Sequence, residues 1–499
     1  MRYIDTPQKI NILEILGTKA SFSPHNYKKV IFGGKNSKTV RDFLSSDLIN
    51  GEEVGSDAYI RKSYKYFVRN KALQQDSFLL NLSSDSVIPI LPSKFVDLKL
   101  REGDLIISKD SNIGETIILD KDYPDHMLSG GLYKLPVDIN KYYLFAFLKH
   151  DFFRTQLNFL VSKGATILHA KKLFLDCLIP LPNQNNSDQV IKYLDTLVRL
   201  VINKEKKIKE NENKVFTLIQ KEISSNQIKK DFKYQFPDLQ QILLTSRIDA
   251  GFYCEDYIKK QFSIKNYTNG AGTIEDWNFE ISRGQNLQVS AIGNSIYSDQ
   301  KKENFYTLVR PTNLSDFGTV TKYEYLGNSR KLSPILEGDI IFSAEGSVGK
   351  CTMFANPKAR TLTNIHGIVL NKKDHNKIES AFVCCFLRYL RNLGVLDYIS
   401  VGGQGGSLAM KYWSEVKIPF FSEAKQWEIA KYYYNPIEHK IHGKDFELLE
   451  NQDLKINEEI GILQLDEQVK VLKEKIHDIV DTIINGDEVN INLAFTDSF

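Results

Sequence analysis

One phrase of the sequence is repeated after 235 residues, and it constrains the fold of this chain more than any other feature. Residues 100–108 and 336–343 both place Glu-Gly-Asp before a short apolar run that ends in Ser. The first glycines, Gly103 and Gly338, are followed eleven residues later by Gly114 and Gly349. This pattern predicts a turn, a buried strand and a second turn in each copy, with the glycines holding the turns.

Other landmarks keep the same order at offsets of 230 to 241 residues. Pro7 precedes Pro237 by 230 residues, and Ile179-Pro180 precedes Ile418-Pro419 by 239 residues. An offset that drifts slowly is what two diverged copies with small insertions produce. We therefore predict two tandem mixed α/β domains, at 1–185 and 226–421. Strand-like runs of the first domain lie at 66–68, 77–80, 87–90, 105–107 and 116–119.

A heptad pattern follows each domain and predicts long helices. The first stripe consists of Val190, Leu194, Leu197, Val201, Ile208, Val215 and Leu218, with Lys204 and Asn211 also on a positions. The second consists of Ile462, Leu465, Val469, Leu472, Ile476, Ile479 and Ile483. We interpret the lysine-rich stretch 204–214 as a solvated face. The predicted fold is α+β: two tandem mixed α/β domains separated by long helices that form an antiparallel coiled coil. These helices are a central spacer at 186–225 and a C-terminal region at 422–499, in which 441–461 has no counterpart after the first copy.

The composition excludes some classes of protein. A formal net charge of +3 is far below that of a dedicated non-specific nucleic-acid binder, so any DNA-binding surface has to be local or shared with a partner. The five cysteines show no metal-type spacing, and we interpret them as reduced thiols of a cytoplasmic protein. The N-terminus has no apolar signal core, and no run approaches 18 apolar residues, so we expect neither secretion nor membrane spanning.

Motifs for catalysis and cofactor binding fail on inspection. Residues 344–352 resemble a phosphate-binding loop, but Ala344 stands where that loop needs glycine and Cys351 where it needs Ser or Thr. No glycine-rich cofactor loop in a strand–helix context is present. His439 and His442 have helical spacing, but no third metal ligand lies near them in the sequence. We therefore expect no catalytic residue, no metal site and no cofactor on this chain.

The loops that repeat are better candidates for function, because their glycine frame is kept while their polar residues differ. A kept frame with changed contents suggests two sites that read two different things. Glycines at 164 and 402–406 would also allow a backbone to approach a phosphate closely, although a flexible connector explains them equally well. The candidate DNA-binding residues are Lys109, Ser111, Asn112, Lys163, Thr166, Lys171, Lys172, Glu345, Ser347, Lys350, Gln404, Ser407, Lys411 and Tyr412.

With these features the sequence resembles the specificity (S) subunits of type I restriction-modification systems over nearly its whole length. The resemblance rests on the strand phrases at 100–108 and 336–343, the glycine after each loop, the exit Ile179-Pro-Leu-Pro182 and the long helix that follows. Residues 247–253 also resemble openings of such domains. The exit at 418–421 lacks the second proline, and 441–461 is not part of the pattern.

The resemblance implies a non-catalytic subunit whose two target-recognition domains each bind one half of a bipartite, asymmetric DNA target. It implies that the helices set the gap between the halves and dock methyltransferase subunits, two by expectation, with restriction subunits joining through the complex. S-adenosylmethionine, ATP and Mg²⁺ would belong to those partners. The alternatives are a coiled-coil interaction protein that binds no DNA, or an S subunit of a related restriction or phage-defence system.

Overall fold

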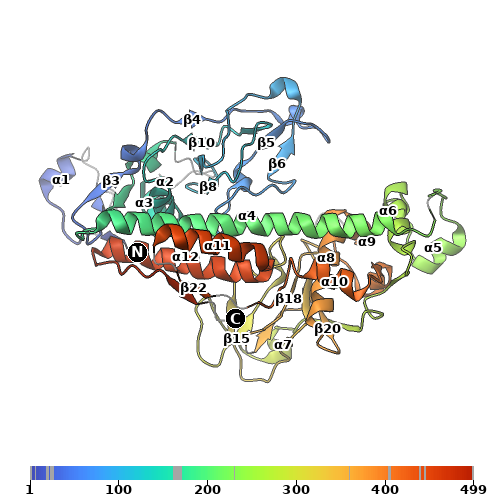
Figure 1. Cartoon of the computed structure of the whole chain (residues 1–499). Coiled ribbons are helices and arrows are strands. Elements are labelled where there is room, and N and C mark those ends of the chain that lie inside the picture. The colour runs from blue at the N-terminus through green and yellow to red at the C-terminus, as the bar shows by residue number, and fades with distance from the viewer. Residues whose placement is uncertain are drawn as a thin grey trace. The chain divides into compact units, whose positions relative to one another are not determined.

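The structure is a computed structural model, and it describes residues 3–5, 7–17, 22, 27–160, 171–229, 231–358, 360–402, 406–437, 440–442 and 445–496 (Figure 1). The chain divides into two compact units. Unit 1 comprises Met1–Lys206, Lys440–Lys455 and Glu467–Thr496, and unit 2 comprises Lys207–His439, Ile456–Asp466 and Asp497–Phe499. Among the described residues, no helix combines the length and the apolar character needed to cross a membrane.

Unit 1 is built on a four-stranded and a three-stranded sheet. The four-stranded sheet has the order β4 (Ile49–Asn50), β10 (Leu132–Leu135), β7 (Leu105–Ser108) and β8 (Thr116–Ile118). The three-stranded sheet has the order β6 (Val87–Pro89), β5 (Tyr66–Val68) and β9 (His126–Leu128), and β5 runs parallel to β9. Two small pairs join β3 (Ser37–Thr39) to β11 (Leu178–Pro180) and β1 (Ile4–Asp5) to β2 (Lys29–Val30). The helices α2 (Lys141–Lys149) and α3 (Asp151–Leu160) complete the domain with fully buried aromatic residues.

Unit 2 repeats this topology. Its central sheet has the order β13 (Phe279–Arg283), β20 (Gly367–Lys372), β17 (Ile340–Ser343) and β18 (Cys351–Met353). A second sheet contains β14 (Ile296–Ser298), β16 (Glu324–Gly327), β15 (Tyr306–Leu308) and β19 (Thr361–Leu362), and β15 runs parallel to β19. The small pair joins β12 (Ala271–Gly272) to β21 (Ile418–Pro419). The helices are α5 (Leu239–Thr245), α6 (Glu255–Lys265), α7 (Val289–Ile292), α8 (Lys377–Asn392), α9 (Val395–Ile399) and α10 (Glu423–Ala430).

The shared strand order confirms the predicted duplication. β7, β8 and β10 each begin 235 residues before β17, β18 and β20. The expected strand at 77–80 is wrong, although Phe78, Leu79 and Leu80 are buried. Leu79 forms only an isolated bridge to Ile118, and the Phe78 amide donates to the carboxylate of Glu205 at 2.9 Å. A side chain from a distant helix therefore satisfies a group that a strand would have paired with a neighbouring strand.

The central helix α4 (Ser187–Ser225) is 39 residues long, close to the predicted span, and rises about 58 Å at ~1.5 Å per residue. All predicted a and d positions from Val190 to Val215 are buried. The lysine-rich stretch is only partly solvated, which corrects the prediction: Lys204 and Lys207 are buried, whereas the Lys206 side chain is 40% exposed. The buried lysines are possible because each ammonium group lies against a carboxylate.

The helices that pack on α4 are α11 (Phe446–Glu459) and α12 (Ile462–Asn485), and all seven predicted apolar positions of α12 are buried. In unit 1, Lys204 donates to Gln468 and Lys475 lies over the Tyr193 ring, so α12 runs antiparallel to α4 as predicted. In unit 2, Lys207 pairs with Glu458 and Asn211 donates to Ile460 O, so α11 runs parallel to α4. Residues 441–461, which have no counterpart after the first copy, thus supply a third helix, α11. Strand β22 (Lys440–His442) precedes α11 and pairs with β23 (Ala494–Thr496).

Candidate nucleic-acid interface

The loop between the first two repeated strands has the same main-chain frame in both units. The amide of Ser108 donates to Glu115 O and that of Ser343 to Lys350 O, both at 2.8 Å. Gly114 and Gly349 have φ of +81° and +89°, and a Cβ at either would lie within 2.7 Å of a leucine methyl group, of Leu157 or of Leu396 respectively. Only glycine meets both conditions, so these glycines are structural, as predicted.

In unit 1 the loop carries Lys109 at its start and two short polar side chains at its tip. Lys109 Nζ donates to Asn50 Oδ1 at 2.8 Å and lies 4.4 Å from the centre of the Tyr133 ring. Ser111 and Asn112 at the tip of the loop are exposed, and Ser111 adopts φ of +63°. The structure therefore holds Lys109 against the sheet and leaves the two tip residues open to a ligand.

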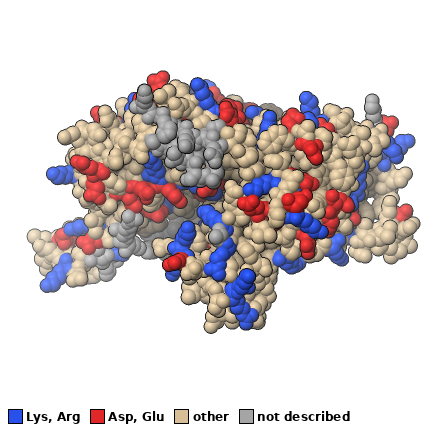
Figure 2. All heavy atoms as spheres, turned by 60° about the horizontal axis from the view of Figure 1, so that its bottom comes forward, with Lys and Arg blue, Asp and Glu red and all other residues tan. Residues whose placement is uncertain are grey.

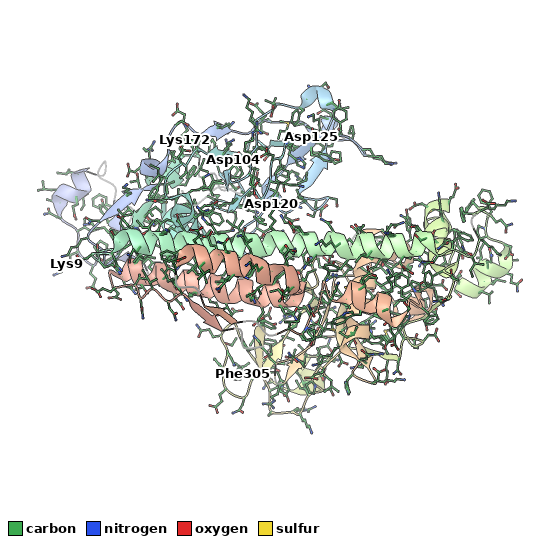
Figure 3. All side chains as sticks on the ribbon, in the orientation of Figure 1. Lys9, Asp104, Asp120, Asp125, Lys172 and Phe305 are labelled. Atoms are coloured by element: carbon green, nitrogen blue, oxygen red, sulfur yellow. The ribbon has the colours of Figure 1, made fainter. Side chains whose placement is uncertain are left out.

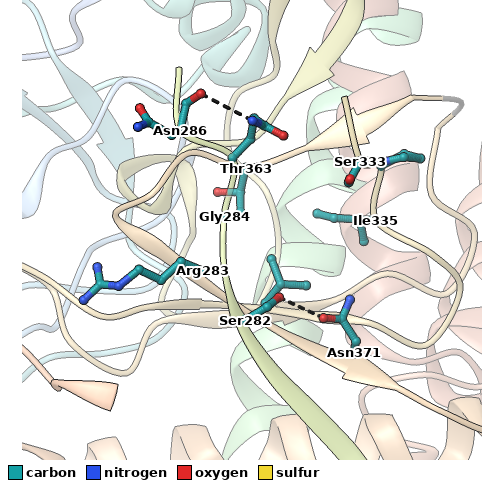
Figure 4. Close-up of a pocket in the computed structure, with 11 residues that line it drawn as sticks. Ser282, Arg283, Gly284, Asn286, Ser333, Ile335, Thr363 and Asn371 are labelled. Carbon is teal, nitrogen blue, oxygen red and sulfur yellow. Dashed lines mark hydrogen bonds between the residues drawn. The ribbon is translucent and has the colours of Figure 1, made fainter. Parts of the chain in front are cut away.

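In unit 2 the equivalent loop forms a charged cluster. Glu345 Oε2 lies 2.7 Å from His366 Nδ1, and Glu345 Oε1 lies 3.9 Å from Arg283 Nη1. Ser347 at the tip is exposed. A surface pocket of about 350 Å³ lies beside this cluster, lined mainly by polar groups from β13, β20 and the segments 284–286 and 333–335. Figure 4 shows Ser282 and Asn371 hydrogen-bonded within it, while the side chain of Arg283 extends away from Ile335 and Ser333.

Lys350 is occupied by an ion pair rather than extended into solvent. Its Nζ lies 3.2 Å from Asp316 Oδ1, and Arg391 Nη1 lies 2.9 Å from the same oxygen. Burial acts to raise the pKa of Asp316, but the charges of Lys350 and Arg391 outweigh it and hold this pKa below its usual range. The Asp316 carboxylate is therefore a stable anchor for Lys350.

The other predicted residues divide into three groups. Lys171, Lys172 and Lys411 are exposed, and Figure 3 shows Lys172 at the edge of its domain. Ser407 exchanges two backbone hydrogen bonds with Val401 and forms a bridge to Glu345. Tyr412 is 7% exposed and lies under the guanidinium group of Arg247, so its ring supports the fold. Lys163, Thr166 and Gln404 lie outside the described residues.

Sequence reasoning missed the residues of β4, β13 and the 366 turn that lie beside these loops. Asn50, Arg283 and His366 are all exposed. No motif marks them, because they are distant in the sequence from the loop residues that their side chains contact. An alignment of the two copies by their strands would have placed Asn50 and Arg283 at equivalent positions. That equivalence was the only feature of the sequence that could have drawn attention to them.

The electrostatic character of the surface is mixed. On the face drawn in Figure 2, Lys and Arg are interspersed with Asp and Glu. This distribution agrees with the small net charge of +3. Binding that is driven mainly by phosphates would need a contiguous basic surface, so recognition by individual side chains suits this chain better.

One group of described residues has the composition of a metal site. Ligand atoms of His150, His477 and Asp481 lie within 4.8 Å of one another. However, His150 Nδ1 accepts a hydrogen bond from the Phe152 amide at 3.1 Å. The proton of the neutral ring is then on Nε2, the atom that faces Asp481 at 3.6 Å, whereas a metal-bound histidine needs a bare nitrogen there. The geometry favours an electrostatic contact of the two histidines with Asp481 over a metal centre.

The comparisons with known proteins give one family match, over part of the first copy and the helix that follows it, and similar solved structures. Residues 60–213 match the family model of the type I restriction modification DNA specificity domain. A crystal structure of a type I restriction-modification S subunit from M. genitalium is similar, with 15% identity, 92% of this chain and 96% of that chain covered, and a TM-score of 0.33. The HsdS subunit from Thermoanaerobacter tengcongensis has 14% identity, 92% and 99% coverage, and a TM-score of 0.28. No curated protein sequence matches the chain.

The repeated domain and the family match over 60–213 support a DNA-recognition subunit of restriction-modification systems. Within that class, residues 60–213 match the type I specificity domain, which supports the resemblance to the specificity (S) subunits noted in the sequence.

Proposed function

We propose that each unit of this chain reads one half of a bipartite, asymmetric DNA target. The observation that carries the proposal is the repeated loop frame with different exposed contents. Unit 1 presents Asn50 on β4 and Asn112 at the loop tip, whereas unit 2 presents Arg283 on β13 and Ser347 at the equivalent loop tip. Different side chains on one backbone frame would read different bases, because sequence is read by contacts to base edges.

The proposal includes modification subunits, two by expectation, that dock on α4, α11 and α12, and a restriction subunit that joins through them. The structure of a related protein concerns complex assembly of a type I restriction-modification system. S-adenosylmethionine, ATP and Mg²⁺ would bind to those partners, and this chain would contribute no catalytic residue. The small net charge supports a reader that binds DNA as part of a larger complex.

The helices are the proposed spacer between the half-targets. The predicted a and d positions of α4 from Val190 to Val215 and all those of α12 are buried, which supports a rod of fixed length. One added heptad in both helices would lengthen such a rod by about 10 Å, or about three base pairs of B-form DNA at ~3.4 Å per pair.

A domain exchange tests the proposal. Residues 1–185 are replaced by the equivalent domain of another S subunit, and the complex with the modification subunits methylates a genomic DNA whose modified sites are then sequenced. We expect one half of the methylated sequence to change and the other half to stay. A change in both halves would contradict the two-reader model. A wild-type complex that shifts no DNA in a gel would favour the coiled-coil interaction protein instead.

A further inference from the structure

We propose that the last residue of the first strand in each central sheet, Asn50 in unit 1 and Arg283 in unit 2, is a base-reading residue, with Asn50 selecting adenine and Arg283 selecting guanine. This inference rests on the proposed function and names the residues that give each half its sequence.

The sheet register makes these two residues structurally equivalent. Asn50 pairs with Tyr133, which pairs with Ile107 on β7. Arg283 pairs with Ile368, which pairs with Phe342 on β17. Ile107 and Phe342 each follow the glycine of Glu-Gly-Asp by four residues. The correspondence therefore comes from hydrogen-bonded pairing and does not depend on the loops.

The backbone immediately after both residues is fixed in the same way. The amides of Gly51 and Gly284 donate to Leu132 O and Gly367 O, at 3.0 and 2.9 Å. A Cβ on either glycine would lie 2.1 Å from a carbonyl oxygen of the segment that it crosses. Both positions thus combine an exposed side chain with a backbone that cannot shift, which is what a base-reading contact requires.

Asn50 is oriented for adenine by Lys109. The hydrogen bond from Lys109 Nζ at 2.8 Å identifies Oδ1 as the oxygen of the amide, and Asn50 is exposed. Oδ1 keeps a second lone pair, so the amide can accept from adenine N6 while Nδ2 donates to N7. The ammonium group of Lys109 is itself held over the Tyr133 ring, 4.4 Å from its centre.

Arg283 is oriented for guanine by two acceptors on one side of its guanidinium group. Nη1 donates to Ile365 O at 3.4 Å and lies 3.9 Å from Glu345 Oε1. The arginine fork has five N–H donors, so an outward pair stays available for guanine O6 and N7. An ion pair at this distance with a side chain that is half exposed contributes little to stability, so folding gives no reason for arginine here.

The test uses the full complex with modification subunits and sequencing of its methylated sites. We expect Arg283→Ala to lower the preference for one G·C pair in one half-target roughly 5- to 150-fold, while the other half stays unchanged. Arg283→Lys keeps the charge without the fork and should relax the same position. Asn50→Ala should relax one A·T pair in the opposite half. The matched controls, Lys322→Ala in unit 2 and Arg41→Ala in unit 1, remove exposed cations paired with Asp299 and Asp176 and should change neither half.

Each other outcome overturns the inference. If Arg283→Ala and Arg283→Lys leave both halves as in the wild type, Arg283 does not read a base. If they weaken methylation equally at all sites, Arg283 contacts a phosphate. Failure of the proposed function looks different, because the wild-type complex would then show no bipartite target at all. A thermal unfolding curve of each variant shows whether it folds. If Arg283→Ala does not fold, the methylated sites of Arg283→Lys decide the question.

Discussion

The buried lysine of α4 gives the sharpest test of how the helices are held. Lys204 Nζ lies 2.6 Å from Asp453 Oδ1 and 2.5 Å from Gln468 Oε1, and the side chains of Lys204 and Asp453 are 2% and 1% exposed. Lys204→Met keeps the aliphatic stem but removes the ammonium group from a buried carboxylate. Breaking a buried pair from one side costs about 3–5 kcal/mol.

The expected shift in melting temperature is large enough to measure. For a domain of 150–250 residues, about 1 kcal/mol corresponds to about 2–4 °C, so the transition of unit 1 should fall by about 6–20 °C. Differential scanning calorimetry of the full chain measures it, since two units can unfold in separate transitions. Lys206→Met is the matched control: its exposed pair with Glu102, at 3.2 Å, should contribute less than about 1 kcal/mol.

A double variant separates charge pairing from packing. Lys204→Met with Asp453→Leu replaces the pair by apolar groups, which is often neutral or stabilising, so most of the lost stability should return. The coupling between the two substitutions would then be about 2 kcal/mol or more. If Lys204→Met cost no more than Lys206→Met, or if the two changes were simply additive, the buried pair would not hold α11 against α4.

Four further predictions follow from other parts of the chain. Burial lowers the pKa of His126 from its ordinary 6.5 to about 4. The unfolded chain therefore binds a proton at His126 more readily than the folded chain does. The full stability is present above pH 6.5, and the free energy of unfolding falls by as much as about 3 kcal/mol as the pH is lowered toward 4. His126→Phe should remove this loss, as measured by urea unfolding at each pH. Gly114→Ala meets both a positive φ and the Leu157 methyl group, and should cost roughly 1–3 kcal/mol in thermal unfolding, whereas Gly17→Ala, with nothing within 4 Å, should not. Adding one heptad to α4 and α12 should lengthen the unmodified gap of the methylated target by about three base pairs without changing either half; an active complex with the parental gap would contradict the spacer role. The purified chain should transfer no methyl group from labelled S-adenosylmethionine, and incorporation above background would disprove this.

The sequence was most informative where one residue type alone satisfies the backbone. The repeated phrases predicted β7 and β17, each followed by a loop whose glycine, Gly114 or Gly349, needs positive φ beside a packed leucine, and the run at 116–119 predicted β8. The heptads predicted α4 and α12 because burial repeats along one face. The sequence could not show α11 as a third helix or the burial of Lys207, since both depend on residues about 250 positions away. The strand expected at 77–80 was wrong for the same reason, because Glu205 on α4 binds its backbone.

The candidate site was less predictable because its exposed side chains contribute little to holding the fold. Lys109 and Lys350 were visible as cations in repeated loops, but the structure directs one to Asn50 and the other to Asp316. The exposed residues Asn50 and Arg283 differ between the copies, while the main-chain hydrogen bonds that follow them are the same. A frame held by backbone hydrogen bonds, glycines and buried aliphatic residues leaves such positions free to change without loss of stability. The side chains that carry least of the folding energy are therefore those in which recognition can diverge, and comparing the two copies within one chain locates them.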